Sequence, residues 1–372
     1  MYFYITLTLN CGQHCKYCYG KCIDEIGEPF PFQVDDNLPT RITYPIRELA
    51  DFLAKDPAPV IIFYGGEPTL ELPTMYSIMD NVKAKEFMMQ TNGLFLNDVE
   101  PDYLKRFQTI LVSLDGNEEL TDHYRGKGNY RRVIDNLKRI RQRGFRGELI
   151  ARMTVDEETR LDDAVKWLIS NEEFPFTSIH WQLDAQFWRR DFNSERVERW
   201  FRRYNDEVSN LVSYWIEHME KTGHVLRIYP LTGLMESLLR EEKTKLRCGA
   251  GWIEFNIQPD GNITPCPVMA GMKEFYLGNI RESAPKDLAD SIFVKNLCNE
   301  CTILDVCGGR CLYANATMLW KEEGYKAVCG TVSNLIESLQ HCLPKIRLMM
   351  RRGELKLQDF EYEKYNSCEI IP

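Results

Sequence analysis

The 372-residue sequence predicts an α/β fold, a partial (β/α)6 TIM-like barrel followed by a small cysteine-rich domain. Two observations lead to this prediction. Short, β-rich apolar runs alternate with amphipathic segments as far as about residue 222, which is typical of parallel strands linked by helices. From Cys248 to Cys329 the hydrophobic pattern weakens and seven cysteines appear among glycines and prolines, so something other than packing must hold this segment.

Six apolar runs are the predicted strands. They are rich in aromatic and β-branched residues, and continuous runs of this kind suit strands that are buried on both faces of a parallel sheet. In chain order they are Tyr2–Leu9, Val60–Tyr64, Phe87–Gln90, Thr109–Leu114, Leu149–Val155 and Ser178–Leu183.

Helical patterns lie between and after these strands. Within Tyr130–Arg143 the apolar residues repeat at four- and three-residue steps, and Gly144 stands where that helix would end. A long helical pattern, Ser194–Lys221, closes the predicted barrel. Further on, a hairpin is predicted to turn at Asp260-Gly261, and a helical tail is predicted from Ser333.

The predicted domain boundaries follow the change in composition. Residues 1–225 form the barrel, residues 226–330 form the cysteine-rich domain, and residues 331–372 form a C-terminal helical tail. No internal repeat or low-complexity linker separates these three segments.

The composition argues against two classes of partner. The net charge of −9 argues against nucleic acid, because a phosphate-binding surface needs clustered Lys and Arg. No apolar run approaches the roughly 20 residues that span a membrane. The N-terminal segment MYFYITLTLN is too short and too polar to be a signal peptide. We therefore expect a cytoplasmic protein with no nucleic-acid partner and no membrane partner.

Three cysteines follow the first predicted strand directly. Cys11, Cys15 and Cys18 are spaced C-x3-C-x2-C, with Cys22 next. Thirteen cysteines without an export signal favour metal ligands, because disulfides are rare in the reducing cytosol. Three thiolates at this spacing can hold three corners of a [4Fe–4S] cluster and leave one iron free. The spacing alone keeps a zinc site open, which would recruit Cys22 or His14.

A second motif, Gly65-Gly66-Glu67-Pro68, follows the second predicted strand. Joined to the cysteine triplet, with Tyr17 before its last member, this motif resembles the radical S-adenosylmethionine superfamily. The resemblance implies a [4Fe–4S] cluster on the three cysteines, whose free iron binds S-adenosylmethionine (SAM). It also implies that the Gly-Gly-Glu motif holds the methionine ammonium. Glycines let the backbone approach a ligand closely, and a glutamate accepts hydrogen bonds from an ammonium.

The same resemblance implies SAM contacts at other strand ends. A serine and an aspartate would lie near the ribose, and Arg152 would bind the methionine carboxylate. A structural pair with a nearby acid would also explain Arg152, and Leu183, an expected adenine contact, would equally suit a hydrophobic core. The expected SAM-binding residues are Gly65, Gly66, Glu67, Pro68, Asn92, Ser113, Asp115, Arg152 and Leu183.

The cysteine-rich segment carries the most specific pattern. Its seven cysteines and Gly261 resemble the SPASM extension of radical SAM enzymes, which implies two auxiliary [4Fe–4S] clusters and therefore three clusters in all. A pair of structural zinc ribbons would use the same thiolates. The expected cluster ligands are Cys11, Cys15, Cys18, Cys248, Cys266, Cys298, Cys301, Cys307, Cys311 and Cys329.

The resemblance also sorts the auxiliary ligands. One cluster would take Cys298, Cys301, Cys307 and Cys329, and the other Cys248, Cys266 and Cys311. Some family members supply a further cysteine between the first two positions of the second set, and this chain does not. Our hypothesis is that this cluster has an open iron, which could bind a substrate thiolate, or a non-cysteine ligand. Cys342 and Cys368 are the alternative fourth ligands, and these two and Cys22 are otherwise free thiols.

The resemblance implies an activity. SAM would be cleaved to methionine and a 5′-deoxyadenosyl radical that abstracts hydrogen from a peptide or protein. A thioether or carbon–carbon crosslink in a ribosomally made peptide is the expected modification. An external electron donor such as ferredoxin or flavodoxin is an expected partner. A separate peptide-recognition protein is another, since the sequence starts at the barrel. The sequence assigns no catalytic acid or base.

Two alternative functions remain. Anaerobic sulfatase maturases, which form formylglycine, resemble this chain in cysteine spacing. That resemblance places an aspartate directly after the second SPASM cysteine, where this chain has Pro267, which cannot accept a proton. The other alternative is a non-catalytic iron–sulfur electron-transfer protein, which would need no ammonium-binding motif.

Overall fold

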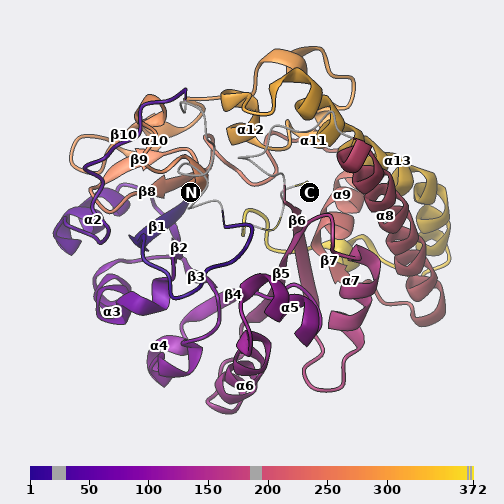
Figure 1. Cartoon of the computed structure of the whole chain (residues 1–372), viewed down its shortest axis with the longest axis horizontal. Coiled ribbons are helices and arrows are strands. Elements are labelled where there is room, and N and C mark those ends of the chain that lie inside the picture. The colour runs from indigo at the N-terminus through magenta and orange to yellow at the C-terminus, as the bar shows by residue number, and fades with distance from the viewer. Residues whose placement is uncertain (19–30, 185–194, 367, 369–370) are drawn as a thin grey trace. The chain divides into compact units, whose positions relative to one another are not determined.

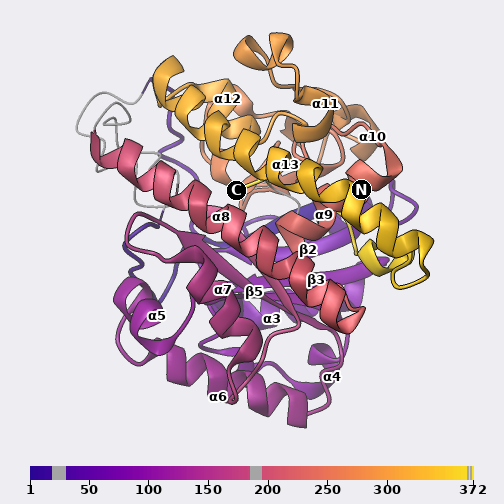
Figure 2. The same cartoon turned by 90° about the vertical axis from the view of Figure 1, so that its right-hand side faces the viewer.

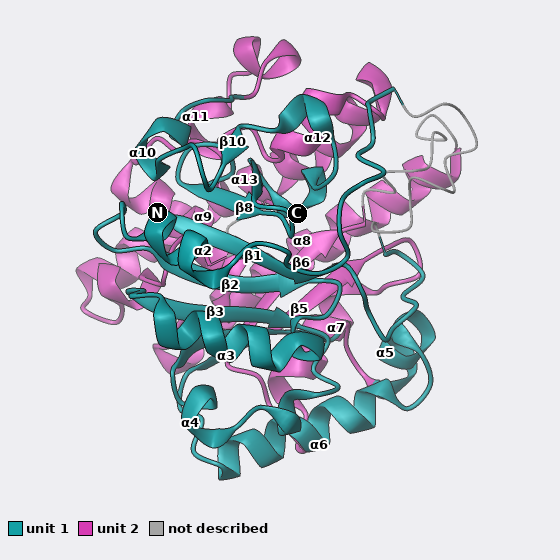
Figure 3. Ribbon diagram, turned by 90° about the vertical axis from the view of Figure 1, so that its left-hand side faces the viewer, with its two compact units in different colours: residues 1–114, 118–150, 249–293 teal, residues 115–117, 151–248, 294–372 magenta. Residues whose placement is uncertain are grey.

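The computed structural model describes residues 1–18, 31–184, 195–366, 368 and 371–372. The chain divides into two compact units, coloured separately in Figure 3. Unit 1 comprises residues 1–114, 118–150 and 249–293, and unit 2 comprises residues 115–117, 151–248 and 294–372. The units cut across the cysteine-rich segment, and the predicted boundaries after residues 225 and 330 stay a prediction.

Unit 1 is built on a mostly parallel sheet. Its strands are β1 (Tyr2–Thr8), β2 (Val60–Gly65), β3 (Glu86–Thr91), β4 (Phe107–Ser113), β8 (Glu254–Ile257), β9 (Asn262–Thr264) and β10 (Gly278–Asn279). The strand order is β10-β9-β8-β1-β2-β3-β4. Strand β1 pairs in parallel with both β2 and β8, whereas β9 is antiparallel to its two neighbours. The first four predicted strands are thereby confirmed.

The predicted hairpin is β8–β9, and it extends this sheet. Gly261 has a φ of 92° at the turn, and the Asn262 amide donates to Asp260 Oδ1 at 2.9 Å. Strand β8 then pairs with β1 from Tyr2 opposite Glu254 to Ile5 opposite Ile257. The sequence predicted the hairpin but not its place beside the first strand.

Helices cover one face of strands β1–β4, as Figure 1 shows. The helices of unit 1 are α2 (Ile46–Leu53), α3 (Leu72–Asn81), α4 (Pro101–Leu104), α5 (Glu118–Arg125), α6 (Asn129–Gln142) and α10 (Pro285–Leu288). Phe3 of β1 packs edge-on against Phe52 of α2, with ring centroids 5.7 Å apart. The other face carries a second buried cluster of Tyr4, Val60, Ile62 and Met88. Burial on both faces explains why these strands are continuous apolar runs.

The predicted helix over 130–143 is confirmed as α6. Its end is set by Arg143 and Gly144, and Gly144 has a φ of 97°. A residue without a Cβ adopts this left-handed conformation without strain, which is why a glycine marks the helix end.

Unit 2 combines short strands with long helices. The strands are β5 (Glu148–Val155, which enters unit 2 at Ala151), β6 (Ser178–Leu183) and β7 (Arg227–Ile228). The helices are α7 (Leu161–Ser170), α8 (Glu195–Thr222), α9 (Tyr229–Arg240), α11 (Leu304–Cys307), α12 (Leu312–Thr317) and α13 (Lys321–Arg351). Helices α8 and α13 run side by side in Figure 2, and Asn334 donates from α13 to the Asn205 carbonyl of α8 at 3.1 Å.

Helix α13 differs from its prediction. It begins at Lys321 rather than at Ser333, and it contains Gly324, Gly330 and Pro344. These residues weaken a helical pattern in sequence, but packing along α8 compensates here. As a result, Cys329 lies inside the same helix as the predicted tail. Within the described parts of the chain, no helix is both long enough and apolar enough to cross a membrane.

Candidate functional site

The loop after β1 presents the first three cysteines. The amide of Gln13 donates to Cys11 Sγ at 3.4 Å, and Gln13 Oε1 accepts from Cys15 Sγ at 3.5 Å. The Cys18 amide donates to the Cys15 carbonyl at 3.2 Å. The buried Gln13 therefore links two of the three thiols. Sequence reasoning missed Gln13, because a glutamine between cysteines has no distinct signal.

Gly65 and Gly66 lie directly against the start of this loop. The amide of Gly66 donates to the Thr8 carbonyl at 2.7 Å. A Cβ on Gly65 would meet the Thr8 carbonyl oxygen at 2.2 Å, and one on Gly66 would meet the Asn10 carbonyl oxygen at 2.2 Å. Both glycines therefore allow two backbone segments to approach closely, and their expected contact with a ligand stays a prediction.

Glu67 is a buried carboxylate that joins two strand ends. Its Oε1 accepts from Thr91 Oγ1 at 2.7 Å and from the Thr69 amide at 3.0 Å, and its Oε2 accepts from the Asn92 amide at 2.7 Å. Burial raises the pKa of the Glu67 carboxyl, and these hydrogen bonds oppose that rise. Pro68 follows as the first residue of a short 3₁₀ turn, η2 (Pro68–Glu71), and is buried.

Asn92 connects this carboxylate to the cysteine loop. Besides its amide bond to Glu67, its Nδ2 lies 3.9 Å from Cys11 Sγ, within hydrogen-bonding range of a sulfur. Its Oδ1 accepts from the Leu94 amide at 2.9 Å, which fixes the side chain. The structure thus brings Cys11, Glu67 and Asn92 together in unit 1. Ser113 ends β4 as a half-buried residue of the same unit.

The other expected SAM contacts belong to unit 2. Asp115 is fully buried, and its Oδ1 accepts from the Thr154 amide at 3.0 Å. Arg152 on β5 donates from Nη2 to the amide oxygen of Gln182 on β6. Its Nε is buried and has no hydrogen-bond partner among the described residues. The observed partner of Arg152 is therefore a neutral amide. Leu183 is buried at the end of β6.

Four cysteines of the second group lie in unit 2, and the thiols of three of them are affected by the charge of another. Cys298 lies in a 3₁₀ turn, η6 (Asn296–Glu300), Cys301 follows it, Cys307 ends α11, and Cys329 lies on α13. Burial raises the pKa of the Cys298 and Cys307 thiols, and that of Cys329 to about 12. The charges of the neighbouring cysteines raise these pKa values further. A cationic cluster bound to these sulfurs would compensate the negative charge that burial and the neighbouring cysteines disfavour.

A buried arginine supports this group. Arg247 donates from Nε and Nη2 to the Val306 carbonyl, at 2.9 and 2.7 Å, and from Nη1 to Ser237 Oγ at 3.1 Å. Its charge, together with hydrogen bonds from the amides of Gly309 and Arg310, lowers the pKa of Cys307 against the effect of burial. Residues outside the cysteine pattern therefore help to stabilise the thiolate form of Cys307.

The remaining cysteines belong to both units. Cys248 and Cys311 lie in unit 2, and Cys266 lies in unit 1 after β9. Cys342 is half-buried on α13, Cys368 is buried, and Cys22 lies outside the described residues. Among the described residues, no three His, Cys, Asp or Glu side chains are grouped to hold one metal ion. An iron–sulfur cube distributes its thiolates over four iron atoms rather than one.

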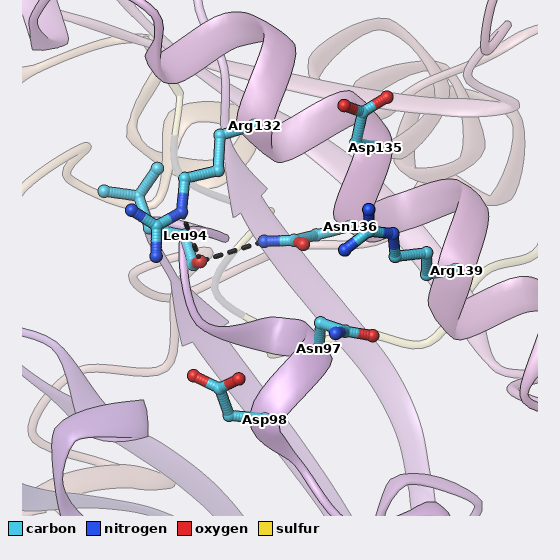
Figure 4. Close-up of a pocket in the computed structure, with 7 residues that line it drawn as sticks. All are labelled: Leu94, Asn97, Asp98, Arg132, Asp135, Asn136 and Arg139. Carbon is cyan, nitrogen blue, oxygen red and sulfur yellow. Dashed lines mark hydrogen bonds between the residues drawn. The ribbon is translucent and has the colours of Figure 1, made fainter.

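A polar cavity of about 400 Å³ is lined in part by residues that follow Asn92 in the chain (Figure 4). Arg132 Nε and Asn136 Nδ2 of α6 both donate to the Leu94 carbonyl, at 3.1 and 2.9 Å. These two donors fix the segment that follows Asn92. Helix α6, which forms part of the cavity wall, therefore supports that segment. The cavity is lined by Leu94, Asn97, Asp98, Arg132, Asp135, Asn136 and Arg139.

Two protein-family models match the chain. The model of the radical SAM superfamily matches residues 5–168. The SPASM model, an iron–sulfur cluster-binding domain, matches residues 248–311.

Among curated proteins, the chain is similar to two from Bacillus subtilis strain 168. It is 25% identical over 298 residues to the antilisterial bacteriocin subtilosin biosynthesis protein AlbA, a match that covers 78% of this chain and 60% of AlbA. It is 23% identical over 296 residues to the sporulation killing factor maturation protein SkfB, covering 76% of this chain and 63% of SkfB. The chain thus spans less than two thirds of the length of either relative.

Solved structures support the fold. Native anSMEcpe with bound AdoMet and the Cp18Cys peptide aligns with a TM-score of 0.69 at 18% identity, covering 93% of this chain and 99% of that one. Streptococcus suis SuiB bound to its precursor peptide SuiA aligns with a TM-score of 0.53 at 15% identity, covering 83% and 71%. At these identities the likeness shows the radical SAM partial-barrel fold.

Proposed function

Because the chain carries a radical SAM domain followed by a SPASM domain, we propose that it is an enzyme that modifies peptides by radical chemistry. It would cleave SAM reductively to methionine and a 5′-deoxyadenosyl radical, which abstracts a hydrogen atom from the substrate. The observation that carries this proposal is the contact of Cys11, Glu67 and Asn92 at the ends of adjacent strands.

The SAM site is proposed from the residues that the sequence indicated. A [4Fe–4S] cluster on Cys11, Cys15 and Cys18 would supply the electron. Among the described residues, Glu67 Oε2 accepts from the Asn92 amide alone, so it retains acceptor capacity for an ammonium. Arg152 has a buried Nε without a hydrogen-bond partner among the described residues, which supports its role as the group that binds the methionine carboxylate.

Two auxiliary clusters are proposed in the SPASM domain, which makes three clusters in all. The charge of Cys301 raises the pKa of Cys298 and Cys329, and the charge of Cys298 raises that of Cys307, which supports a four-thiolate site. The second set, Cys248, Cys266 and Cys311, is proposed from sequence alone, with an open iron or a ligand other than cysteine.

The proposed substrate is a ribosomally made peptide, and the proposed product contains a thioether or carbon–carbon crosslink. The names of AlbA and SkfB, which refer to the biosynthesis of a bacteriocin and the maturation of a killing factor, support this substrate class. An external ferredoxin or flavodoxin as electron donor, and a separate peptide-recognition protein, complete the proposed set of partners.

Formylglycine formation is less well supported. Pro267 follows Cys266 as the first residue of a short 3₁₀ turn, η4 (Pro267–Met269), and its side chain carries no atom that accepts a proton. The same position would need a carboxylate to act as the general base.

Formation of 5′-deoxyadenosine by the anaerobically reconstituted protein tests the proposal. With SAM and dithionite, we expect 5′-deoxyadenosine to accumulate, and a deuterated peptide substrate to transfer deuterium into it. A protein that carries iron and sulfide but forms no 5′-deoxyadenosine would instead be an iron–sulfur electron carrier.

A further inference from the structure

Two side chains outside the cysteine pattern contact the sulfur of Cys298. The Tyr325 hydroxyl lies 3.2 Å from Cys298 Sγ, and Asn315 Nδ2 lies 3.5 Å from it. Asn315 Nδ2 also lies 3.2 Å from the Tyr325 hydroxyl, so the three groups form a closed triangle. All three residues belong to unit 2 and are buried.

Asn315 is held rigidly in this triangle. Its Oδ1 accepts from the Lys295 amide at 2.6 Å, and its Nδ2 donates to the Lys295 carbonyl at 2.8 Å. One amide hydrogen is therefore used by Lys295, and the second points to the triangle. Asn315 comes from α12 and Tyr325 from the first turns of α13, so two elements converge on one sulfur.

The direction of both hydrogen bonds follows from the role of the sulfur. As a cluster ligand, Cys298 is a thiolate without a proton, so the hydroxyl and the amide must donate to it. Packing alone does not require these donors, because a phenylalanine would fill the volume of Tyr325 apart from its oxygen. Two donors aimed at one buried sulfur therefore need an electrostatic explanation.

We propose that Tyr325 and Asn315 raise the reduction potential of the auxiliary cluster on Cys298, Cys301, Cys307 and Cys329 by hydrogen bonding to Cys298 Sγ. The step is a one-electron reduction of the [4Fe–4S] core from 2+ to 1+, in which no bond breaks and Tyr325 keeps its proton. Reduction adds negative charge to the thiolates, and donors to sulfur stabilise that charge. This inference rests on the proposed presence of the cluster.

The test is a redox titration of the full-length reconstituted protein, followed by electron paramagnetic resonance with dithionite as reductant. At the wild-type midpoint we expect Tyr325→Phe to lower the ratio of reduced to oxidised cluster about tenfold, which equals about 59 mV for one electron. Only one of the titrating signals should move. The matched control is Tyr276→Phe, which removes a phenol that donates to Asp35 at 2.9 Å in unit 1.

Iron content is measured on the same samples. An unchanged midpoint in Tyr325→Phe with full iron would overturn the proposal, and so would loss of iron, because Tyr325 would then hold the cluster rather than set its potential. Formation of 5′-deoxyadenosine in these samples separates the two claims. A protein with a shifted midpoint and no SAM cleavage would retain this inference while refuting the proposed function.

Discussion

Gly66 places the end of β2 against the backbone that leads to Cys11. The Gly-Gly-Glu motif is recognisable in the sequence. The reason for Gly66 is visible only in the folded structure, because a Cβ at this position would collide with the Asn10 carbonyl oxygen. The sequence assigned no role to Gln13 or Thr91. Gln13 hydrogen-bonds to Cys11 and Cys15, and Thr91 donates to Glu67, but a single Gln or Thr carries no spacing that could reveal such a role.

Gly66→Ala should displace the first cysteine loop. Its Cβ would lie 2.2 Å from the Asn10 carbonyl oxygen, which is backbone and cannot rotate away. We expect the purified variant to lose about a third of its iron, the share of one cluster in three, and to form no 5′-deoxyadenosine. Gly330→Ala is the control, because nothing lies within 4 Å of its added Cβ. Full iron in Gly66→Ala would contradict the steric explanation.

Arg152→Met should weaken SAM binding. The methionine side chain keeps the apolar stem but removes the charge and the buried Nε, which we assign to the SAM carboxylate. Equilibrium binding should show a Kd for SAM raised at least tenfold, about 1.4 kcal/mol. Arg199→Met, on an exposed arginine that pairs with Glu195, should leave the Kd unchanged. An unchanged Kd in Arg152→Met would show that Arg152 does not bind SAM and that its role is the structural hydrogen bond to Gln182.

At the scale of elements, hydrophobic periodicity predicted the strands and helices whose burial is determined by their own sequence. The strands β1–β6 and the helix α6 carry their burial pattern in their own sequence. The hairpin that contains β8 was predicted, but its place beside β1 was not, because that place depends on pairing across some 250 residues, as in the bond from Thr6 Oγ1 to Asn256 Oδ1. Helix α13 begins at Lys321, before the predicted start at Ser333. The segment between these residues contains Gly324 and Gly330, whose cost to a helix is offset by packing that no local window contains.

Strand β8 also carries a titration that should be visible in stability. Glu254 is buried beside Tyr4, and burial raises its carboxyl pKa well above the usual value. The folded state therefore favours the protonated acid. The stabilising contribution is complete below the unfolded pKa, about 4.3, and is lost as pH rises toward the folded value, by up to about 1.4 kcal/mol per pH unit.

Chemical unfolding at several pH values checks this expectation. Relative to Glu254→Gln, the wild type should lose free energy of unfolding as pH rises above about 4.3. Glu282→Gln, on an exposed residue, should follow the wild type. Parallel curves for the wild type and Glu254→Gln would show that Glu254 is not protonated in the folded protein.

At the scale of the whole molecule, the cysteine pattern indicated the radical SAM and SPASM domains, which the α/β fold class alone does not indicate. The α/β class with a mostly parallel sheet was predicted correctly, and the radical SAM and SPASM domains match the motifs that suggested them. The contacts around Cys298 could not be predicted. Asn315 and Tyr325 come from separate helices and meet the Cys298 sulfur only after folding.

The most direct test compares 5′-deoxyadenosine formation by Cys15→Ala and Cys301→Ala in the presence of the peptide substrate. We assign SAM cleavage to the proposed first cluster and product formation to the proposed auxiliary clusters. Cys15→Ala should therefore abolish 5′-deoxyadenosine, whereas Cys301→Ala should form some of it without modified peptide. Equal loss of 5′-deoxyadenosine in both variants, with iron retained at the unaltered sites, would contradict this division of roles.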